Sequence, residues 1–376
     1  MDFSLTEEQA MLADSVARLI EADYDFETRQ AIAASDDGFS REMWQSFCEL
    51  GWTAVMFAEE DGGLDGGATE LMLMLEHFGR GLVVEPFLAN VILAGGILKR
   101  AASPEQREKW LAPMIGGELQ TALAFAEPQA RFDATNIATT ARPTDAGYVL
   151  NGRKTLVLNG QHADLLIIPA RSDGEQTAEA GISLFAVAGD ASGLKRKGYP
   201  TVDAFQAAEI ELADVEVTAE NLVGELDAGF SVLRDVVAEA TLAVSAEAIG
   251  IMQVMHDKTV EYSKDRIQFG VPIGSFQALQ HRMVDTMMAC EQSRSLMYWA
   301  VMKQAAGGDG ARRAISALKY QVGTAGMDVA REAVQIHGGM GVTWELDIAH
   351  YFKRMCAIDL LFGNADYHLD RFADSA

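Results

Sequence analysis

Cationic and amide side chains gather around a predicted turn in the stretch 262–282. Gly270, Pro272 and Gly274 interrupt a long helical pattern there, and Ser275 is the predicted N-cap of the helix that follows. The first turn of a helix presents free amide groups that bind phosphate groups. The side chains placed to assist them are those of Lys264, Arg266, Gln268, Gln277 and Gln280. Together these residues predict a site for a phosphate or a pyrophosphate.

Each of these residues alone is also typical of a solvated salt bridge or of a polar helix face. The whole string is more specific, because Arg266-x-x-Phe-Gly, then Ile-Gly274, then Phe276-Gln-x-x-Gln resembles the flavin-binding signature of the acyl-CoA dehydrogenase family. A second string, Gln335-Ile-His-Gly-Gly-Met-Gly, is similar to the glycine-rich turn of that family. In the family both segments reach the FAD of a neighbouring subunit. The resemblance implies that FAD contacts Arg266, Gln268, Phe269, Phe276, Gln277, Gln280, Gln335, Gly338 and Gly339.

The elements that must position these segments follow from the period of the apolar residues. Capping boxes at Thr6-Glu-Glu-Gln and Ser103-Pro-Glu-Gln predict helix starts, and helical spacing continues to residue 117. Short β runs follow, among them a predicted hairpin over 148–158 around an Asn-Gly turn. We therefore predict an α+β fold, which the resemblance also implies. Its predicted parts are an N-terminal helical domain (1–117), a middle β-domain (118–225) and a C-terminal helical bundle (226–376).

The middle domain departs from the family pattern. Flavin contacts in the family usually read Thr-Glu-Pro-Gly-Ala-Gly-Ser-Asp and Trp-Ile-Thr-Asn, but here the text is Ala-Glu-Pro-Gln-Ala-Arg-Phe-Asp (126–133) and Leu-Val-Leu-Asn (156–159). The resemblance therefore leaves the main-chain amides of Leu156 and Leu158 as flavin contacts. Such losses resemble the heteromeric branch of the family, which includes the small subunit of pimeloyl-CoA dehydrogenase and in which unlike subunits share sites. The implied assembly is a heterotetramer, with a homo-oligomer as the alternative.

The usual catalytic base of the family is also replaced. Family members carry it in a Glu-Gly-Thr-Ser motif, whereas this chain reads Leu-Phe-Gly-Asn-Ala-Asp over 361–366, so that Phe362 stands in place of the glutamate. Glu247 interrupts an apolar, small-residue helical stripe that includes Val236, Ala240, Ala243, Val244 and Ile251. We predict that Glu247 is the base and faces a small-residue cavity, as in some heteromeric members. A buried salt bridge to a Lys or Arg is the alternative.

Other titratable residues rank lower as candidates for the reaction. Glu239 falls off the stripe and is the second candidate base, while Asp366 is a remote one. We expect His337 and His368 to be structural. Cys48, Cys290 and Cys356 are isolated and lack CxxC spacing, which argues against a zinc site and a disulfide framework.

Charge and composition limit the partners. The 376 residues include 30 Lys and Arg against 55 Asp and Glu, a net charge of −25, which argues against nucleic acid or an anionic membrane as a partner. We see no charged-then-apolar leader and no apolar run long enough to span a bilayer, and we expect a cytoplasmic protein.

The resemblance implies FAD-dependent α,β-desaturation of an acyl-CoA. The heteromeric branch handles dicarboxylyl or bulky acyl chains, including steroid side chains, in β-oxidation, and electron-transfer flavoprotein is the implied acceptor. Two other functions are considered. One is a flavin oxidase or monooxygenase on the same fold, and the other is a non-catalytic scaffold subunit that supplies FAD-binding segments to its partner.

Overall fold

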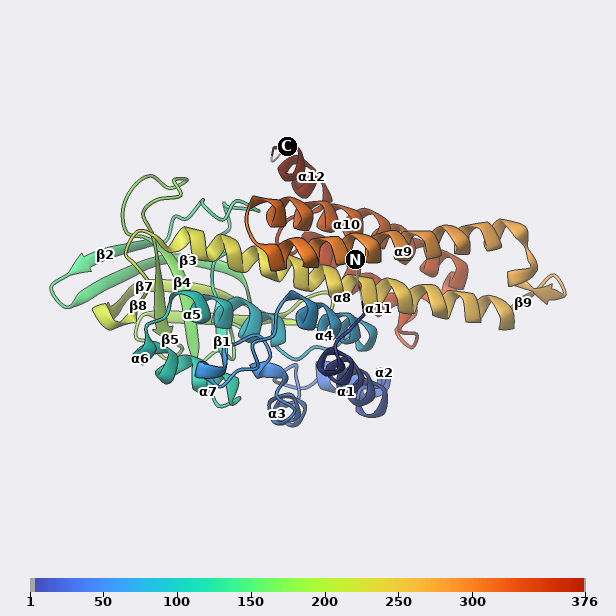
Figure 1. Cartoon of the computed structure of the whole chain (residues 1–376), viewed down its shortest axis with the longest axis horizontal. Coiled ribbons are helices and arrows are strands. Elements are labelled where there is room, and N and C mark those ends of the chain that lie inside the picture. Colours follow the sequence, from blue (N-terminus) through green and yellow to red (C-terminus); the bar gives the residue numbers. More distant parts are fainter. Residues whose placement is uncertain (1–3, 375–376) are drawn as a thin grey trace. The chain divides into compact units, whose positions relative to one another are not determined.

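The computed structural model describes residues 4–374 and combines many helices with one main β-sheet (Figure 1). The predicted fold class is confirmed, because N-terminal helices are followed by a sheet and then by C-terminal helices. Residue contacts divide the chain into two compact units. The helical unit contains residues up to 31, 67–83 and 241 onward, and the sheet unit contains 32–66 and 84–240. The predicted domain limits at 117 and 225 stay predictions.

The helical unit is built from long helices with apolar faces. Thr6 accepts a hydrogen bond from the Gln9 amide, and the Gln9 side chain accepts one from the Thr6 amide, so the predicted capping box at the start of α1 is confirmed. Helix α8 begins in the sheet unit and continues into the helical unit. The helices are α1 (Glu7–Asp23), α2 (Phe26–Ala33), α4 (Ala68–Gly81), α8 (Gly229–Asp265), α9 (Gln277–Ala306), α10 (Asp309–His337), α11 (Ile348–Leu360) and α12 (Ala365–Asp374).

A short hairpin separates α8 from α9. It consists of β9 (Ile267–Gln268) and β10 (Val271–Pro272), followed by the single turn η6 (Ile273–Ser275). The N-cap of α9 is Phe276, and no side chain caps this helix start. The predicted N-cap Ser275 is wrong, because it lies one residue too early and its hydroxyl donates back to the Pro272 carbonyl oxygen (2.7 Å).

The sheet unit holds an eight-stranded sheet in the strand order β6-β7-β3-β2-β4-β5-β8, with β1 pairing parallel to β4. Most neighbouring strand pairs are antiparallel. Side chains from several strands form an apolar core that includes Leu150, Leu166, Ile168, Phe185 and Ile210. The strands are β1 (Thr121–Leu123), β2 (Thr140–Thr144), β3 (Gly147–Leu158), β4 (Leu165–Arg171), β5 (Ile182–Ala188), β6 (Leu194–Pro200), β7 (Gln206–Thr218) and β8 (Leu222–Val223).

The predicted hairpin over 148–158 is wrong, because these residues belong to the single strand β3. Asn151 and Gly152 lie at a register shift against β7, where the Asn151 side chain donates to Asp214 (2.9 Å). A Cβ on Gly152 would lie 2.4 Å from the Thr139 hydroxyl, so close packing rather than a turn requires the glycine here. The actual hairpin joins β2 to β3 through residues 145 and 146. The Asn151-Gly152 pair therefore marks a bulge in β3 rather than a turn.

The remaining segments of the sheet unit are short helices before the sheet. The capping box of Ser103 and Gln106 is confirmed at the start of α6. These segments are α3 (Arg41–Glu49), η1 (Trp52–Ala54), η2 (Glu59–Asp61), η3 (Leu88–Ala94), α5 (Gly95–Ala101), α6 (Pro104–Gln106), η4 (Arg107–Leu111), α7 (Ala112–Ile115) and, between β7 and β8, η5 (Ala219–Asn221). Within residues 4–374, no helix has the length and apolar character needed to cross a membrane. All three cysteines are free.

Candidate functional site

The two sequence signatures lie together in the helical unit. The Tyr262 ring stacks on the His337 ring with centroids 4.3 Å apart. Ile273 and Ile336 share one buried apolar cluster with Met283, which anchors the turn η7 (Gly338–Val342) beside the β9–β10 hairpin. His337 is held through its Nδ1 at the Ala333 carbonyl oxygen (2.8 Å), in keeping with a structural role. We call residues 266–280 and 335–341 together the arm.

Most of the arm's predicted FAD contacts are exposed to solvent. Phe269 is 94% exposed and meets the half-buried Phe276 edge-on at 6.2 Å. Within residues 4–374, no hydrogen bond or ion pair joins the Arg266 guanidinium to another residue. Gln280 donates to the Gly274 carbonyl oxygen (2.8 Å) and so braces the hairpin. The other exposed members are Gln268, Gln277, Gln335, Gly338 and Gly339.

The arm fits the diphosphate of FAD. The start of α9 has no side-chain cap, so its first amide groups are available to an anion, and Arg266 adds a positive charge. Gly338 has a φ of +62°, which favours glycine. A Cβ at Gly338 or at Gly339 would have no heavy atom within 4 Å, so a ligand can approach this backbone closely. The arm therefore has the donors and the space that a diphosphate needs.

The segment of the sheet unit that is predicted to contact the flavin offers less. Leu156 is 43% exposed and has a φ of +49° at a register shift in β3. The Tyr199 hydroxyl donates to the Glu209 carboxylate (3.4 Å). Burial and the charge of Glu209 raise the pKa of Tyr199. Leu158 is half-buried.

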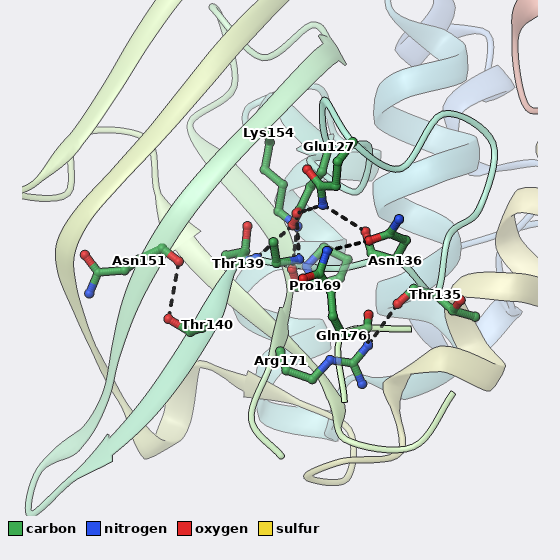
Figure 2. Close-up of polar contacts among 12 residues, drawn as sticks. Glu127, Thr135, Asn136, Thr139, Thr140, Asn151, Lys154, Pro169, Arg171 and Gln176 are labelled. Carbon is green, nitrogen blue, oxygen red and sulfur yellow. Dashed lines mark hydrogen bonds and ion pairs between the residues drawn. The ribbon is translucent and has the colours of Figure 1, made fainter. Parts of the chain in front are cut away.

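A buried ion pair fixes the loop in front of that segment. Lys154 on β3 is fully buried, and its Nζ donates to Glu127 (2.6 Å) and to the Pro169 carbonyl oxygen (2.7 Å). Figure 2 shows Lys154 and Glu127 pointing toward one another. Glu127 also accepts from the amides of Ala138 (2.7 Å) and Thr139 (3.1 Å). The pair therefore ties the loop between β1 and β2 to two strands.

Burial lowers the pKa of Lys154 to about 8, and the attraction of Glu127 opposes that effect. Burial alone would raise the pKa of Glu127, but the charge of Lys154 and its hydrogen bonds outweigh it, so the pKa of Glu127 is lowered. Arg171 adds a second tie, because its guanidinium donates to four carbonyl oxygens, two of which belong to Thr135 and Gln176 (2.8 Å each; Figure 2). The sequence analysis missed both ties. The Glu-Pro of 127–128 within the family-like string was the available signal.

Glu247 is not the isolated carboxylate that its stripe suggested. Its two oxygens accept from Nε (2.6 Å) and Nη2 (2.7 Å) of Arg354 on α11. The side chains are 5% and 3% exposed. This is the salt bridge that the sequence analysis left open as the alternative. Glu239, the second candidate base, pairs with Arg100 in the sheet unit (2.8 Å), and Asp366 is exposed on α12.

The small-residue stripe beside Glu247 is a packing seam. A Cβ on Gly79 of α4 would lie 2.1 Å from the Glu247 carbonyl oxygen, and one on Gly250 would lie 2.0 Å from that of Glu76. Helices α4 and α8 therefore approach closely, with Ala243 and Val244 fully buried. The predicted cavity is absent at Gly79, because the neighbouring helix fills the space that the small residues leave.

The loop that replaces the usual base motif has an unusual backbone. Phe362 has a φ of +61°, and its carbonyl oxygen lies 3.1 Å from His368 Nε2. The buried Lys319 donates to the carbonyl oxygens of Asp359 (2.9 Å) and Gly363 (2.7 Å). Burial lowers the pKa of Lys319 to about 8 and that of His368 to about 3. His368 is therefore a neutral, structural group that helps Lys319 to hold this loop.

A pocket opens in the sheet unit beside Leu158. It encloses about 350 Å³ of empty space, its mouth included. The volume open to the centre of a water molecule is only about 20 Å³, which is room for about one water. Most of its lining is apolar, and Glu85 is its one charged residue. The lining residues are Gly38, Phe39, Val84, Glu85, Pro86, Leu88, Ala89, Leu158, Asn159, Phe205 and Gln206.

Comparison with known proteins agrees with this architecture. Models of the N-terminal, middle and C-terminal domains of acyl-CoA dehydrogenase match residues 6–118, 122–215 and 227–376. The chain is 32% identical over 325 residues to the short-chain-specific acyl-CoA dehydrogenase of Megasphaera elsdenii, a match that covers 84% of each chain.

Two solved structures are similar over the whole chain. The ChsE4–ChsE5 complex from Mycobacterium tuberculosis has a chain with a TM-score of 0.90 and 28% identity, covering 100% of this chain and 98% of that one. The FAD complex of PigA has a TM-score of 0.91 and 27% identity, covering 100% and 98%. With three matching domain models and an arm that fits a diphosphate, this chain belongs to the acyl-CoA dehydrogenase family and is an oxidoreductase that uses FAD to dehydrogenate an acyl-CoA.

Proposed function

We propose that this chain is one subunit of a heteromeric acyl-CoA dehydrogenase, of the branch that includes the small subunit of pimeloyl-CoA dehydrogenase. Its partner in a heterotetramer is an unlike subunit of the same family. The substrate is a dicarboxylyl-CoA or a bulky acyl-CoA such as a steroid side chain in β-oxidation. FAD would supply the acceptor for the hydride of the β-carbon, with Arg266 and Gln277 of the arm holding its diphosphate, and electron-transfer flavoprotein is the electron acceptor of this proposal.

The observation that carries this proposal is the exposure of the arm residues to solvent. Arg266 and Gln277 are exposed at the uncapped start of α9, whereas in the sheet unit Leu156 and Leu158 replace the Trp and Thr of the family's Trp-Ile-Thr-Asn string. The chain is thus better equipped to bind the FAD of a neighbour than to hold one through its own sheet. When unlike subunits share a site, one chain must contribute contacts to the FAD that its partner holds. The exposed arm of this chain suits that role. A solved chain of a two-protein complex, ChsE4–ChsE5, has a similar fold.

Sedimentation with detection at the flavin absorption band tests the assembly. The chain purified alone is expected to be colourless, and the chain purified with its partner is expected to sediment as a yellow complex. A monomer that carries one FAD per chain would contradict the proposal. So would a homo-oligomer with full FAD occupancy.

The arm is tested by Arg266→Ala in the complex. Loss of a hydrogen bond to a charged group is expected to weaken FAD binding by about 1.5–3 kcal/mol. Arg331→Ala is the matched control, because Arg331 is an exposed arginine paired with Asp328 on α10. A flavin titration that finds equal affinities for both variants would remove Arg266 from the FAD site.

The proposed base of this chain is Glu247. If it removes the α-proton, Glu247→Gln keeps acyl-CoA binding and slows anaerobic flavin reduction by about 10²–10⁴-fold. The ion pair with Arg354 favours a second candidate function, a subunit that supplies the arm and leaves proton removal to its partner. Arg354→Gln is the control, because it breaks the same pair and leaves the carboxylate. Equal rates in both variants and the parent would support the scaffold function.

A further inference from the structure

Tyr262, near the end of α8, links the two segments of the arm. Its carbonyl oxygen accepts a hydrogen bond from the amide of Arg266 (2.9 Å), the first residue of the arm. Its ring stacks on the ring of His337 in the second segment, with the two planes 26° apart. Its hydroxyl donates to the His337 carbonyl oxygen (3.4 Å). One residue outside the arm therefore contacts the backbone of both arm segments.

Apolar side chains fill the space around Tyr262. It packs against a buried cluster that holds Ile273 of the first segment and Ile336 of the second. A Cβ on Gly274 would lie 2.9 Å from the Ser263 hydroxyl, so the β9–β10 side of the arm also approaches α8 closely. Close-packed interiors respond to the loss of even a few atoms. A change in the size of the Tyr262 ring is therefore felt by both segments.

The contact with His337 acts on the glycines that FAD is predicted to approach. The His337 carbonyl belongs to the planar peptide group that joins it to Gly338, so the Tyr262 hydroxyl bears on the orientation of that plane. His337 is 5% exposed, and the hydrogen bond from its Nδ1 to the Ala333 carbonyl oxygen fixes its ring for the stack. The turn at Gly338 is thus held from α8 as well as from α10, whose last carbonyl oxygens accept the Gly338 amide.

We propose that Tyr262 is a positioning residue for FAD, which sets the open backbone of the Gly338 turn so that it meets the same diphosphate as Arg266. A ligand that contacts two segments binds more tightly when both are already in place, because binding then includes no cost of ordering them. This inference rests on the role of the arm in the proposed function. It adds the residue that makes one site of two segments far apart along the chain.

Three variants separate the ring, the hydroxyl and the fold. Tyr262→Leu removes the stack and the hydroxyl, whereas Tyr262→Phe removes the hydroxyl alone. Tyr320→Leu is the matched control, because Tyr320 is a half-buried tyrosine of α10 outside the arm. In each variant the segment after the turn keeps the ion pair between Lys258 of α8 and Asp347. The helical unit is therefore expected to stay folded, which urea denaturation checks.

Equilibrium dialysis of the assembled complex gives the FAD dissociation constant of each variant. Tyr262→Leu is expected to weaken FAD binding by about 10- to 100-fold, the loss of one hydrogen bond to a charged group. Tyr262→Phe is expected to stay within about threefold of the parent, because it keeps the ring and loses one long hydrogen bond. Tyr320→Leu is expected to bind FAD as the parent does.

The coupling between Tyr262 and Gly338 is a readout that general destabilisation would not produce. Gly338→Ala places a Cβ in the open space beside the turn and is expected to weaken FAD binding by about 10-fold in the parent. In Tyr262→Leu the turn is already displaced, so the same change is expected to have less than about a threefold effect. Arg266→Ala is expected to keep its full effect, because the Arg266 amide still bonds the carbonyl oxygen of residue 262.

Equal FAD affinities of Tyr262→Leu and Tyr320→Leu would overturn the inference. So would additive effects of Tyr262→Leu and Gly338→Ala. Should urea denaturation show that Tyr262→Leu is unfolded, His337→Gln removes the same stack from the other side and is judged by the same two criteria. If this chain alone forms a homo-oligomer with full FAD occupancy, the heteromeric function fails, and the same titrations of that homo-oligomer still decide the role of Tyr262.

Discussion

Two buried ion pairs, Lys154–Glu127 and Arg354–Glu247, differ in what their cations bind. In the sheet unit, Lys154 contacts one oxygen of Glu127 and a carbonyl oxygen of β4, and Glu127 in turn binds loop amides. In the helical unit, Arg354 occupies both oxygens of Glu247. The first pair ties backbone segments together, whereas the second joins α8 to α11 through a contact between side chains. Equal burial therefore serves two different purposes.

The difference shows how a lone buried carboxylate should be interpreted. Glu247 has the burial expected of a catalytic base, but a guanidinium already binds both of its oxygens. Glu127 has more partners and lies closer along the chain to Leu156, a predicted flavin contact. The position of a carboxylate on an apolar stripe therefore indicates its chemical role less well than the residue with which it pairs.

The largest expected effect is on the pair of Glu247 and Arg354, because one guanidinium binds both carboxylate oxygens. Arg354→Met leaves the Glu247 carboxylate buried without its arginine and is expected to reduce the free energy of unfolding by about 3–5 kcal/mol. The measurement is urea denaturation. The double variant Glu247→Leu with Arg354→Met is expected to recover most of the loss, since an apolar pair of similar size is often neutral. A double variant as unstable as the single one would show that the pair does more than compensate charge.

Lys154→Met is expected to cost less, about 3 kcal/mol, because Glu127 keeps the amides of Ala138 and Thr139 as donors. The loop between β1 and β2 should also lose order, which protection of its amides against hydrogen exchange would detect. A loss of free energy of unfolding larger than that of Arg354→Met would contradict the expected order of the two pairs. Lys154→Arg serves as the control that keeps the charge.

His368 extends the comparison to a buried group that bonds a hydroxyl and a carbonyl rather than a carboxylate. Burial lowers the pKa of His368 to about 3, so below pH 6.5 the unfolded chain binds a proton that the folded chain does not. Stability contributed by this group is therefore complete above pH 6.5 and is lost as the pH falls toward 3, by about 1.4 kcal/mol per pH unit.

This prediction is measured as the stability of the parent minus that of His368→Gln between pH 7.5 and 4.5. The difference should fall as the pH falls, since glutamine does not titrate. A constant difference would mean that folding does not lower the pKa of His368.

The smallest effect is expected at Arg100, whose pair with Glu239 is partly exposed, at 26% and 12%. Water screens such a pair, so Arg100→Met is expected to reduce the free energy of unfolding by at most about 1 kcal/mol. The same urea measurement applies. A loss close to that of Arg354→Met would show that burial does not decide the strength of these pairs.

Much of the fold could be predicted because its signals are local. Thr6 and Ser103 cap helices through residues three positions away, and the stop of α8 before Gly270 follows from nearby glycines and a proline. The Asn-Gly of β3 misled because the same dipeptide suits a tight turn and a bulge. Only its strand neighbours, β2 and β7, decide between them.

The candidate site divides in the same way. The sequence by itself determined which residues make up the arm, because the strings that contain Arg266, Gln277 and Gly338 resemble the family's flavin-binding signatures. Their contact with FAD stays a prediction. Tertiary structure alone decided that Arg354 pairs with Glu247 across 107 positions and that Lys154 pairs with Glu127 across 27. It also decided that Glu85 lines a pocket with Leu158. Charges so far apart along the chain leave no period or spacing to detect, and the free energy of burying one depends on which partner the fold brings to it.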